Sequence, residues 1–323
     1  MVKKEIKVLY VYKHNRSFVK RDLEMLSKHF DVRALYFNFF SFFLLPFSVY
    51  WSDVIFIWFA SYHAFFSTLW GKLLGKKMVV VTGGYDVAAA PQIDYGLMRS
   101  SWIGYMVKFV LRHADMILAV SKFNREEIYR HTGIKGVKVV YNSIDHQKFR
   151  PEGEKEDIII TVGFVSADNM KRKGLETFIR AAKYLPNVRF ILIGKAEDNS
   201  IEYLNSIATP NIEFTGFVTD DELLEWYQRA KVYCQLSYYE SFGMAAAEAM
   251  LCECVPVVTR KGALPEVVGE TGFYVEYGDE KATANAIKKA LNSQSGVKAK
   301  ERIKESFSYG IREGELVKLV EGL

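Results

Sequence analysis

Short, continuous apolar runs alternate with amphipathic stretches along the whole chain, and this rhythm limits the possible folds more than any other feature. Runs that are apolar throughout, rather than at every second position, are typical of strands buried on both faces, as in a parallel sheet between two layers of helices. The alternation therefore predicts repeated strand–helix units. The clearest runs are IKVLYVY, DVIFIWF, MVVVTG and DMILAVS in the first half, and DIIITVGF, VRFILIG and VPVVT in the second.

A short polar segment, PEGEKED at residues 151–157, separates the two series of runs and has the composition of a linker. The chain of 323 residues is about twice the length of a typical domain. We therefore predict an α/β protein with one doubly wound domain at residues 1–150 and a second at residues 151–323. Each should bind its ligand at the carboxyl ends of its strands. Thr219, three residues before Glu222, predicts a capping box at the start of one helix.

The charge is unevenly divided between the two halves. Residues 1–150 hold 22 Lys and Arg against 11 Asp and Glu, whereas residues 151–323 hold 21 against 27. The basic half is either an ordinary solvated surface or a surface that attracts an anionic partner. No long Lys/Arg cluster, recognition-helix pattern or RNA-binding aromatic pattern accompanies the charge, so we expect no nucleic-acid partner.

Several common site types lack their sequence patterns. No G-x-G-x-x-G follows an expected strand and no G-x-x-x-x-G-K-[ST] occurs, which disfavours dinucleotide and P-loop sites. The three cysteines form no C-x-x-C pair and lie near no His cluster, so we expect neither a metal site nor a disulfide framework. The first residues lack a signal-peptide cleavage site. We therefore expect a cytoplasmic protein.

The stretch from Ala34 to Ser52 has no charged residue and contains FNFFSFFLLPFSVYW. Its length barely reaches that of a membrane span, and Pro46 interrupts it. Because apolar strands flank it on both sides, we expect it to be buried inside the first domain. The alternative is an aromatic face that rests on a bilayer, aided by the basic surface.

The segment from Tyr238 to Val275 is the most informative for chemistry. Glu240 precedes the strongly helical AAAEAM, and Glu248 lies within it. Ser241 is a good candidate for the N-cap of this helix. A helix N-terminus at the end of a strand binds phosphate, and a carboxylate can hold two hydroxyl groups. The backbone amides expected to face such a ligand belong to Phe242, Gly243 and Met244.

On these residues the chain resembles the retaining, nucleotide-sugar-dependent glycosyltransferases of family 4, which have the GT-B fold of two Rossmann-like domains facing a cleft. The likeness covers nearly the whole chain and implies that a last helix, at about residues 309–323, packs back on the first domain. It rests on ESFGMAAAEAM, on VPVVTRKGALPEVVGETGFYV, on KRKGLETFIRAA after TVGF, and more loosely on ADMILAVS and YNSIDHQKFRP.

The resemblance also implies roles for single residues. Glu240 would contact the transferred sugar and Glu248 the ribose, while Lys173 would hold the diphosphate as it leaves. A lysine and a helix N-terminus stabilise the charge that develops on a leaving phosphate, so we expect no metal and no cofactor. The remaining donor-side residues would be Gly163, Arg172, Ser241, Phe242, Gly243 and Met244, and those on the acceptor and sugar side Asp86 and Asn15.

The sequence departs from the family pattern in several places. Phe164 follows Gly163 where the family commonly has an arginine, so that Arg172 or Lys171 would have to supply the charge. Gly83 stands where the family often has a histidine, and KHNRSFVKRD replaces a Gly-Gly loop after the first strand. These departures keep a non-catalytic nucleotide-sugar binder or accessory subunit as an alternative, and a nucleotide-sugar epimerase is another.

We therefore predict a hexosyltransferase that acts with retention in the synthesis of a glycan or cell-envelope polysaccharide. Its donor partner is a nucleoside-diphosphate sugar, and its acceptor is a glycan or a lipid-linked phosphate. A peripheral contact with an anionic membrane would place the protein at the inner face of that membrane.

Overall fold

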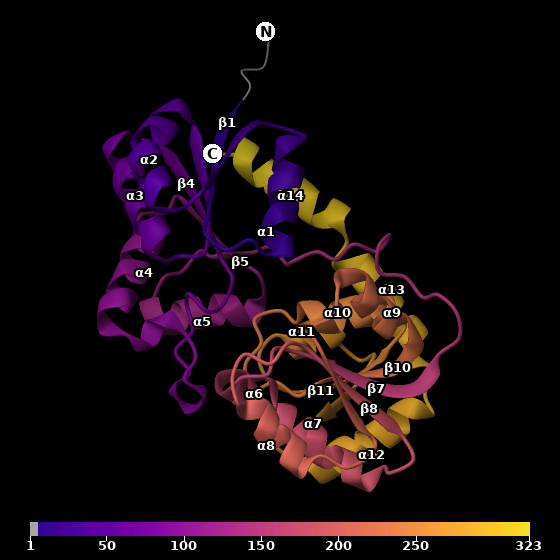
Figure 1. Cartoon of the computed structure of the whole chain (residues 1–323). Coiled ribbons are helices and arrows are strands. Elements are labelled where there is room, and N and C mark those ends of the chain that lie inside the picture. Colours follow the sequence, from indigo (N-terminus) through magenta and orange to yellow (C-terminus); the bar gives the residue numbers. More distant parts are fainter. Residues whose placement is uncertain (1–5) are drawn as a thin grey trace. The chain divides into compact units, whose positions relative to one another are not determined.

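The structure is a computed structural model that describes residues 6–323, and it divides the chain into two compact units (Figure 1). Of the described residues, unit 1 comprises those up to Ser143 with Tyr309–Leu323, and unit 2 comprises Ile144–Ser308. Each unit is built on one six-stranded sheet, in which all the paired strands run parallel. The predicted α/β class with doubly wound parallel sheets is confirmed.

The sheet of unit 1 has the strand order β2-β1-β3-β4-β5-β6. Its strands are β1 (Lys7–Tyr12), β2 (Asp31–Tyr36), β3 (Val54–Trp58), β4 (Lys77–Thr82), β5 (Met116–Ala119) and β6 (Lys138–Val139). Its helices are α1 (Ser17–Ser27), α2 (Phe39–Trp51), α3 (Tyr62–Leu73), α4 (Ser101–His113), α5 (Lys122–Thr132) and α14 (Tyr309–Glu321), with 3-10 turns η1 (Pro91–Ile93) and η2 (Leu97–Arg99).

Strand β3 shows why the apolar runs are continuous. Ile55 and Ile57 pack into the core on one face of the sheet. Phe56 and Trp58, which alternate with them, pack into a separate core on the other face. Because successive side chains of a strand point to opposite faces, a strand covered on both sides must be apolar at every position.

The sheet of unit 2 has the order β12-β11-β10-β7-β8-β9, so the chain reverses direction across the sheet between β7 and β10. Loops that follow the strands at such a switch point form the usual ligand crevice of a doubly wound sheet. The strands are β7 (Glu156–Val162), β8 (Arg189–Ile193), β9 (Ile212–Gly216), β10 (Ala230–Gln235), β11 (Val255–Thr259) and β12 (Phe273–Val275).

The helices of unit 2 are α6 (Ala167–Lys173), α7 (Leu175–Ala181), α8 (Ser200–Ile207), α9 (Asp220–Arg229), α10 (Met244–Leu251), α11 (Leu264–Val268), α12 (Glu280–Leu291) and α13 (Ser295–Ser306), with the 3-10 turn η3 (Ala182–Tyr184). The predicted capping box is present at the start of α9. The Thr219 hydroxyl accepts a bond from the amide of Glu222, whose carboxylate accepts one from the amide of Thr219.

Helix α2 contradicts the expectation that residues 34–52 are buried. Only Ser41, Leu45 and Val49, at a spacing of four residues, are buried on this helix. Phe42 and Trp51 are partly buried, and the six other large apolar side chains are exposed, because a single helix has only one face to pack on a sheet and this sequence is apolar on every face. Within residues 6–323, the structure has no helix that is both long and apolar enough to span a bilayer.

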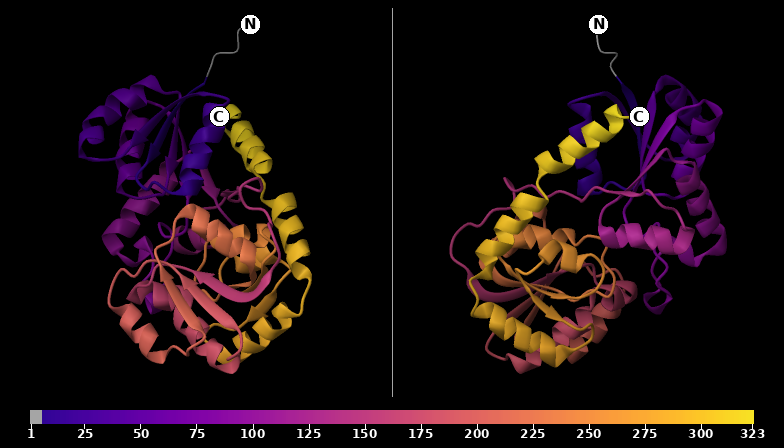
Figure 2. Two further views of the ribbon diagram at one scale, coloured as in Figure 1. Left: turned by 45° about the vertical axis from the view of Figure 1, so that its right-hand side comes forward. Right: turned by 180° about the vertical axis from the view of Figure 1, so that it is seen from behind.

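Helix α14 is tied into unit 1 by a buried ion pair. The Arg312 guanidinium donates to both carboxylate oxygens of Asp22 in α1, at 2.6 and 2.7 Å, and both side chains are almost fully buried. Trp58 Nε1 donates to the same carboxylate at 3.0 Å, while Arg312 Nη1 donates to the carbonyls of Val140 and Tyr141. Figure 2 shows α14, in yellow, beside α1.

Replacing Arg312 by methionine should therefore destabilise unit 1 strongly. The change leaves the Asp22 carboxylate buried without its cation, and the loss of one partner of a buried pair typically costs about 3–5 kcal/mol. Urea unfolding followed by tryptophan fluorescence measures the effect. The control is Arg99→Met, which removes an exposed pair with Asp94 and should cost no more than about 1 kcal/mol. Equal losses in the two variants would contradict this account.

Candidate functional site

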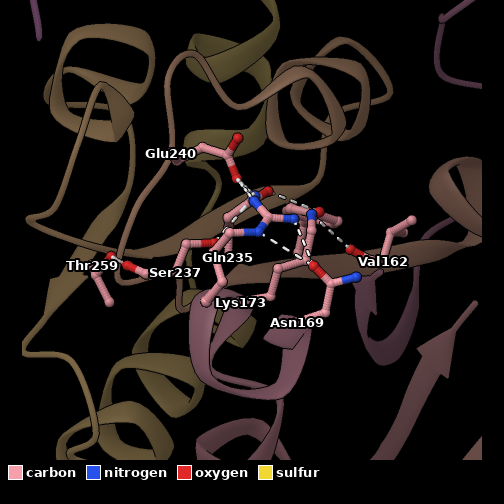
Figure 3. Close-up of polar contacts among 9 residues, drawn as sticks. Val162, Asn169, Lys173, Gln235, Ser237, Glu240 and Thr259 are labelled. Carbon is pink, nitrogen blue, oxygen red and sulfur yellow. Dashed lines mark hydrogen bonds and ion pairs between the residues drawn. The ribbon is translucent and has the colours of Figure 1, made fainter. Parts of the chain in front are cut away.

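The residues predicted for the donor side lie in unit 2, around the loops that follow β7 and β10. Gly163 comes directly after β7, and Arg172 and Lys173 are the last residues of α6. Glu240 lies in the loop between β10 and α10, and Glu248 lies inside α10. Figure 3 shows the polar contacts that join Lys173, Glu240 and their neighbours.

Glu240 is held by a side chain that sequence reasoning missed. Gln235, the last residue of β10, is 3% exposed, and its Nε2 donates to Glu240 Oε2 at 2.7 Å (Figure 3). The Tyr233 hydroxyl donates in turn to Gln235 Oε1 at 3.0 Å. The available signal is a single amide side chain directly after the apolar run VYC. Gln235 therefore fixes one oxygen of Glu240 and leaves the carboxylate's other oxygen to other partners.

Lys173 lies beside the end of β7. Its Nζ donates to the carbonyl of Val162 at 3.3 Å, and its aliphatic stem covers Gly163 so closely that a Cβ at residue 163 would be 2.6 Å from Lys173 Cδ. Burial lowers the pKa of Lys173 to about 8, although the charges of Glu240 and Glu248 act in the opposite direction. The protein thus holds an ammonium group in a place where it is poorly solvated, which favours the binding of an anion.

Arg172 lies next to Glu240 as well. Its Nη1 is 3.8 Å from Glu240 Oε2, and its Nη2 donates to Asn169 Oδ1 at 2.8 Å. Its carbonyl accepts a bond from the amide of Tyr238, which ties the end of α6 to the loop after β10. Phe164, at the position of the family's arginine, is 43% exposed. Arg172 rather than the exposed Lys171 is therefore the cation that lies within reach of Glu240.

The prediction that Ser241 caps helix α10 is wrong. The N-cap is Gly243 with φ 100°, a left-handed conformation that glycine adopts without strain. Ser241 is buried, and Phe242 is buried with its ring against Phe307. The helix therefore begins later than expected, at Met244. The first backbone amides of a helix have no acceptor within it, so those at the start of α10 can face a ligand.

Glu248 lies one turn into α10, where Tyr227 donates its hydroxyl to Glu248 Oε2 at 3.4 Å. Its charge acts on the pKa of Lys173 together with that of Glu240. The structure therefore brings Lys173, Arg172, Glu240 and Glu248 into one electrostatic cluster at the carboxyl edge of the sheet. Carboxylates accept bonds from hydroxyl groups, and the two cations and the helix start suit phosphate oxygens.

Two glycines allow neighbouring loops to pack directly on the backbone before α10. Gly262 has φ 62°, and a Cβ there would lie 2.3 Å from the carbonyl oxygen of Glu240. Gly174 has φ 63°, and a Cβ there would lie 2.2 Å from the carbonyl oxygen of Leu236. The amide of Ala263 also donates to the Glu240 carbonyl at 2.8 Å. The position of Glu240 is thus fixed from both sides of its loop.

The acceptor-side candidates lie in unit 1. Asp86 is fully buried, and its carboxylate accepts bonds from the amides of Ala60, Gly83 and Gly84 at 2.9–3.1 Å. Burial raises the pKa of this carboxyl to about 6, against the effect of those amides. Asp86 therefore shapes the loop after β4 through its backbone. Asn15 is exposed in the loop between β1 and α1.

The same loop explains why a glycine replaces the family's histidine. A Cβ at Gly83 would lie 2.0 Å from the ring of Phe59, which occupies the space that a side chain would need. In the part of the chain that the structure describes, no three His, Cys, Asp or Glu side chains gather as they would around a metal ion.

Comparisons with known proteins agree with this architecture. The family model for glycosyl transferases group 1 matches residues 157–293, and that for Glycosyltransferase Family 4 matches residues 8–148. The capsular polysaccharide biosynthesis glycosyltransferase CapM of Staphylococcus aureus is 31% identical over 216 residues, which cover 61% of this chain and 56% of CapM. The serotype-specific mannosyltransferase WbdA of Escherichia coli is 27% identical over 59% of this chain and 26% of WbdA. The matches thus span about half of CapM and a quarter of WbdA.

Among solved structures, Anabaena Alr3699/HepE in complex with UDP and glucose superposes with a TM-score of 0.80. The match covers 98% of this chain and 100% of that one at 16% identity, which is evidence for a shared fold.

Replacing Gly262 by alanine should strain the loop that holds Glu240. A left-handed backbone costs an L-residue about 1–2 kcal/mol, and here the new Cβ must also displace the Glu240 carbonyl. We expect the free energy of unfolding to fall by at least about 2–3 kcal/mol in chemical denaturation. Gly278→Ala is the control, because Gly278 has φ 86° but open space around it, and it should lose only about 1–2 kcal/mol. Similar losses at both positions would show that Gly262 does not support Glu240.

Proposed function

Because the chain belongs to the GT-B glycosyltransferases, we propose that it transfers a sugar from a nucleoside diphosphate to an acceptor during the synthesis of a glycan or cell-envelope polysaccharide. The observation that supports this activity best is the cluster of Lys173, Glu240 and Glu248 beside the start of α10, at the switch point of the unit 2 sheet. The cluster combines groups for phosphates with groups for hydroxyls in the place where doubly wound sheets bind their ligands.

In this proposal the donor lies across the ends of β7 and β10. Lys173 and the first amides of α10 hold the diphosphate, together with the backbone at Gly163. Glu240 accepts bonds from hydroxyls of the transferred sugar, and Glu248 accepts bonds from the ribose. The Gln235 contact supports the first assignment, because it fixes the direction of the Glu240 carboxylate before any ligand arrives.

The reaction breaks the bond between the anomeric carbon and the diphosphate oxygen, and the diphosphate leaves with the electron pair. The acceptor oxygen forms the new bond on the same face of the sugar, which retains the configuration, and its proton passes to the released diphosphate. Lys173 and the helix start stabilise the charge that develops on the leaving oxygen. The proposal therefore includes no metal and no further cofactor.

The donor is proposed to be a hexose-type nucleotide sugar. Two comparisons support that class: HepE was solved with UDP and glucose, and WbdA is a mannosyltransferase. For the acceptor we propose a glycan or a lipid-linked phosphate, since the first half of the chain is basic. A cytoplasmic enzyme at the inner face of a membrane would meet such a lipid acceptor.

A panel of UDP-, GDP- and ADP-sugars in thermal-shift assays identifies the nucleobase of the donor, because a bound ligand stabilises the folded state.

The alternative of a non-catalytic nucleotide-sugar binder keeps one observation in its favour. Phe164 presents an exposed aromatic ring where the family has an arginine. A binder would raise its melting temperature with a nucleotide sugar yet release no nucleoside diphosphate with any acceptor. The enzyme would release it in proportion to the product formed.

Glu240→Gln and Lys173→Met should each lower the rate of transfer by about 100-fold or more, because single groups that stabilise developing charge contribute effects of that size. The rate of nucleoside diphosphate release with acceptor measures the loss. Lys171→Met is the matched control, since Lys171 is exposed and lies two residues before Lys173 in the same helix. This variant should keep the activity of the wild type. Turnover like that of the wild type in both site variants would refute these roles. Proton NMR of the product tests retention separately, and an inverted anomer would refute the proposed stereochemistry.

The activity should also fall at alkaline pH because of Lys173. Its pKa in the free protein is about 8, so the protonated fraction decreases as the pH rises through 8 and the diphosphate loses its cation. We expect kcat/KM for the donor to drop about tenfold per pH unit above that value. The dissociation constant of the nucleoside diphosphate should rise over the same pH range, because the bound anion loses its cation.

Two variants provide the comparison for this pH dependence. Lys173→Arg carries a charge that persists above pH 12, so its alkaline limb should disappear. Lys173→Met should bind the nucleoside diphosphate weakly, with an affinity that does not change between pH 7 and 10. An unchanged limb in the binding curve of Lys173→Met would show that another group titrates.

A further inference from the structure

Helix α2 exposes six large apolar side chains on the surface of unit 1. The helix has no Asp, Glu, Lys, Arg or His along its length, and Figure 1 shows it at one side of unit 1, next to α3. These side chains form what we call the α2 face: Phe39 (75% exposed), Phe40 (78%), Phe43 (60%), Leu44 (59%), Phe47 (76%) and Tyr50 (74%).

The residues of the α2 face follow one another along the helix at spacings of three and four residues, which makes them neighbours on its surface. Ring contacts at centroid distances of 5.5–5.8 Å join Phe39 to Phe40 and Phe43, and Phe43 to Phe42. An aromatic side chain offers roughly 150–250 Å², so the five aromatic residues of this face, which are mostly exposed, present several hundred Å². Soluble proteins rarely expose a contiguous apolar patch of that size unless a partner or a membrane covers it.

Cations border this patch at the carboxyl end of the helix. The Arg33 guanidinium lies 3.9 Å from the centroid of the Trp51 ring, and Lys7 Nζ lies 5.7 Å from it. Lys76 Nζ lies 5.8 Å from the Tyr50 ring and donates to the carbonyls of Tyr50 and Ser52. The nearest acidic residue in sequence, Asp53, accepts a bond from the backbone amide of Lys7.

The length of the helix restricts what it can do in a bilayer. Thirteen residues at about 1.5 Å each extend about 20 Å, which is too short for a hydrocarbon core of about 30 Å. Pro46 has no amide hydrogen, so the carbonyl one turn before it lacks its helical partner. Such a carbonyl needs water, which is available at the headgroup level and absent from the hydrocarbon.

We propose that α2 is a membrane-docking helix that lies in the plane of an anionic lipid surface. The aromatic side chains of the α2 face enter the boundary between headgroups and acyl chains, where helices that lie in the interface bury Phe and Leu. Arg33, Lys7 and Lys76 meet the lipid phosphates at its carboxyl end. The buried residues Ser41, Leu45 and Val49 keep the helix attached to unit 1.

Charge favours a lipid surface over a second copy of this chain. Two copies that met through the α2 face would offer their cations no carboxylate from this helix, since residues 34–52 contain neither Asp nor Glu. A surface of anionic lipid supplies an apolar layer and a layer of phosphates together. The proposal rests on this surface alone and does not depend on the donor chemistry proposed for unit 2.

The test is sedimentation of the full chain with vesicles of phosphatidylcholine alone or with about one third phosphatidylglycerol. The wild type should sediment with the anionic vesicles. Phe43→Gln combined with Phe47→Gln should weaken that binding at least tenfold, because two aromatic side chains no longer enter the interface. Arg33→Gln should weaken binding to anionic vesicles about fivefold and leave binding to neutral vesicles unchanged.

The matched control is Phe217→Gln, since Phe217 is 72% exposed and belongs to unit 2 rather than to the α2 face. It should bind as the wild type does, and circular dichroism verifies that every variant is folded. Failure of the wild type to sediment with anionic vesicles would overturn the proposal. Equal binding of the Phe43/Phe47 variant and the Phe217 control would overturn it too. Light scattering tests whether a second copy of the chain covers the α2 face instead. A wild type that is a dimer and does not bind vesicles, together with a monomeric Phe43/Phe47 variant, would assign the face to a second copy.

Discussion

The candidate site depends on how closely three stretches of backbone approach one another around Glu240. Gly174 and Gly262 lie against the carbonyls of Leu236 and Glu240 at distances that exclude a Cβ. Both glycines adopt left-handed conformations, so a residue with a side chain at either position would be strained and would prevent the same contact. Gln235 then fixes the carboxylate itself. A side chain held by its backbone and by a buried amide needs little reorganisation when a ligand binds, which is how sites on rigid elements gain precision.

The burial of Lys173 lowers the stability of the folded protein at neutral pH. Its pKa of about 8 lies below the usual value for lysine, so the folded protein binds this proton less tightly than the unfolded chain does. Stability linked to this group is therefore lower at neutral pH and is regained as the pH rises from about 8 toward the ordinary pKa of lysine. An anion that binds beside the ammonium removes the same penalty. A buried charge that is unfavourable until a ligand binds is typical of functional sites. This property distinguishes Lys173 from the exposed Lys171.

The sequence predicted those features that depend on local pattern. Continuous apolar runs indicated strands buried on both faces, and Thr219 with Glu222 indicated a helix start, because both signals involve only neighbouring residues. It could not place the N-cap of α10, because Ser241 is buried by tertiary packing and Gly243, in a left-handed conformation, takes the cap position instead. Gln235 was missed for a similar reason. Its importance arises from a bond to a residue beyond the strand, which periodicity does not reveal. The roles of Glu240, Glu248 and Lys173 remain predictions, although the structure brings these side chains together.

Helix α2 shows the limit of pattern most clearly. A helix that is apolar on every face is usually buried, and both flanking strands are indeed in a core. Yet only one face of α2 can contact the sheet. Whether its other faces are buried depends on whether another element or molecule covers them, and the local sequence does not predict this. In unit 1 the α2 face is open, whereas the polar cluster lies wholly within unit 2. Apolar and charged ligands would thus be handled by separate units. A nucleotide sugar from water and an acceptor embedded in lipid differ in this same respect, so the two proposals, though argued from different residues, describe compatible halves of one reaction.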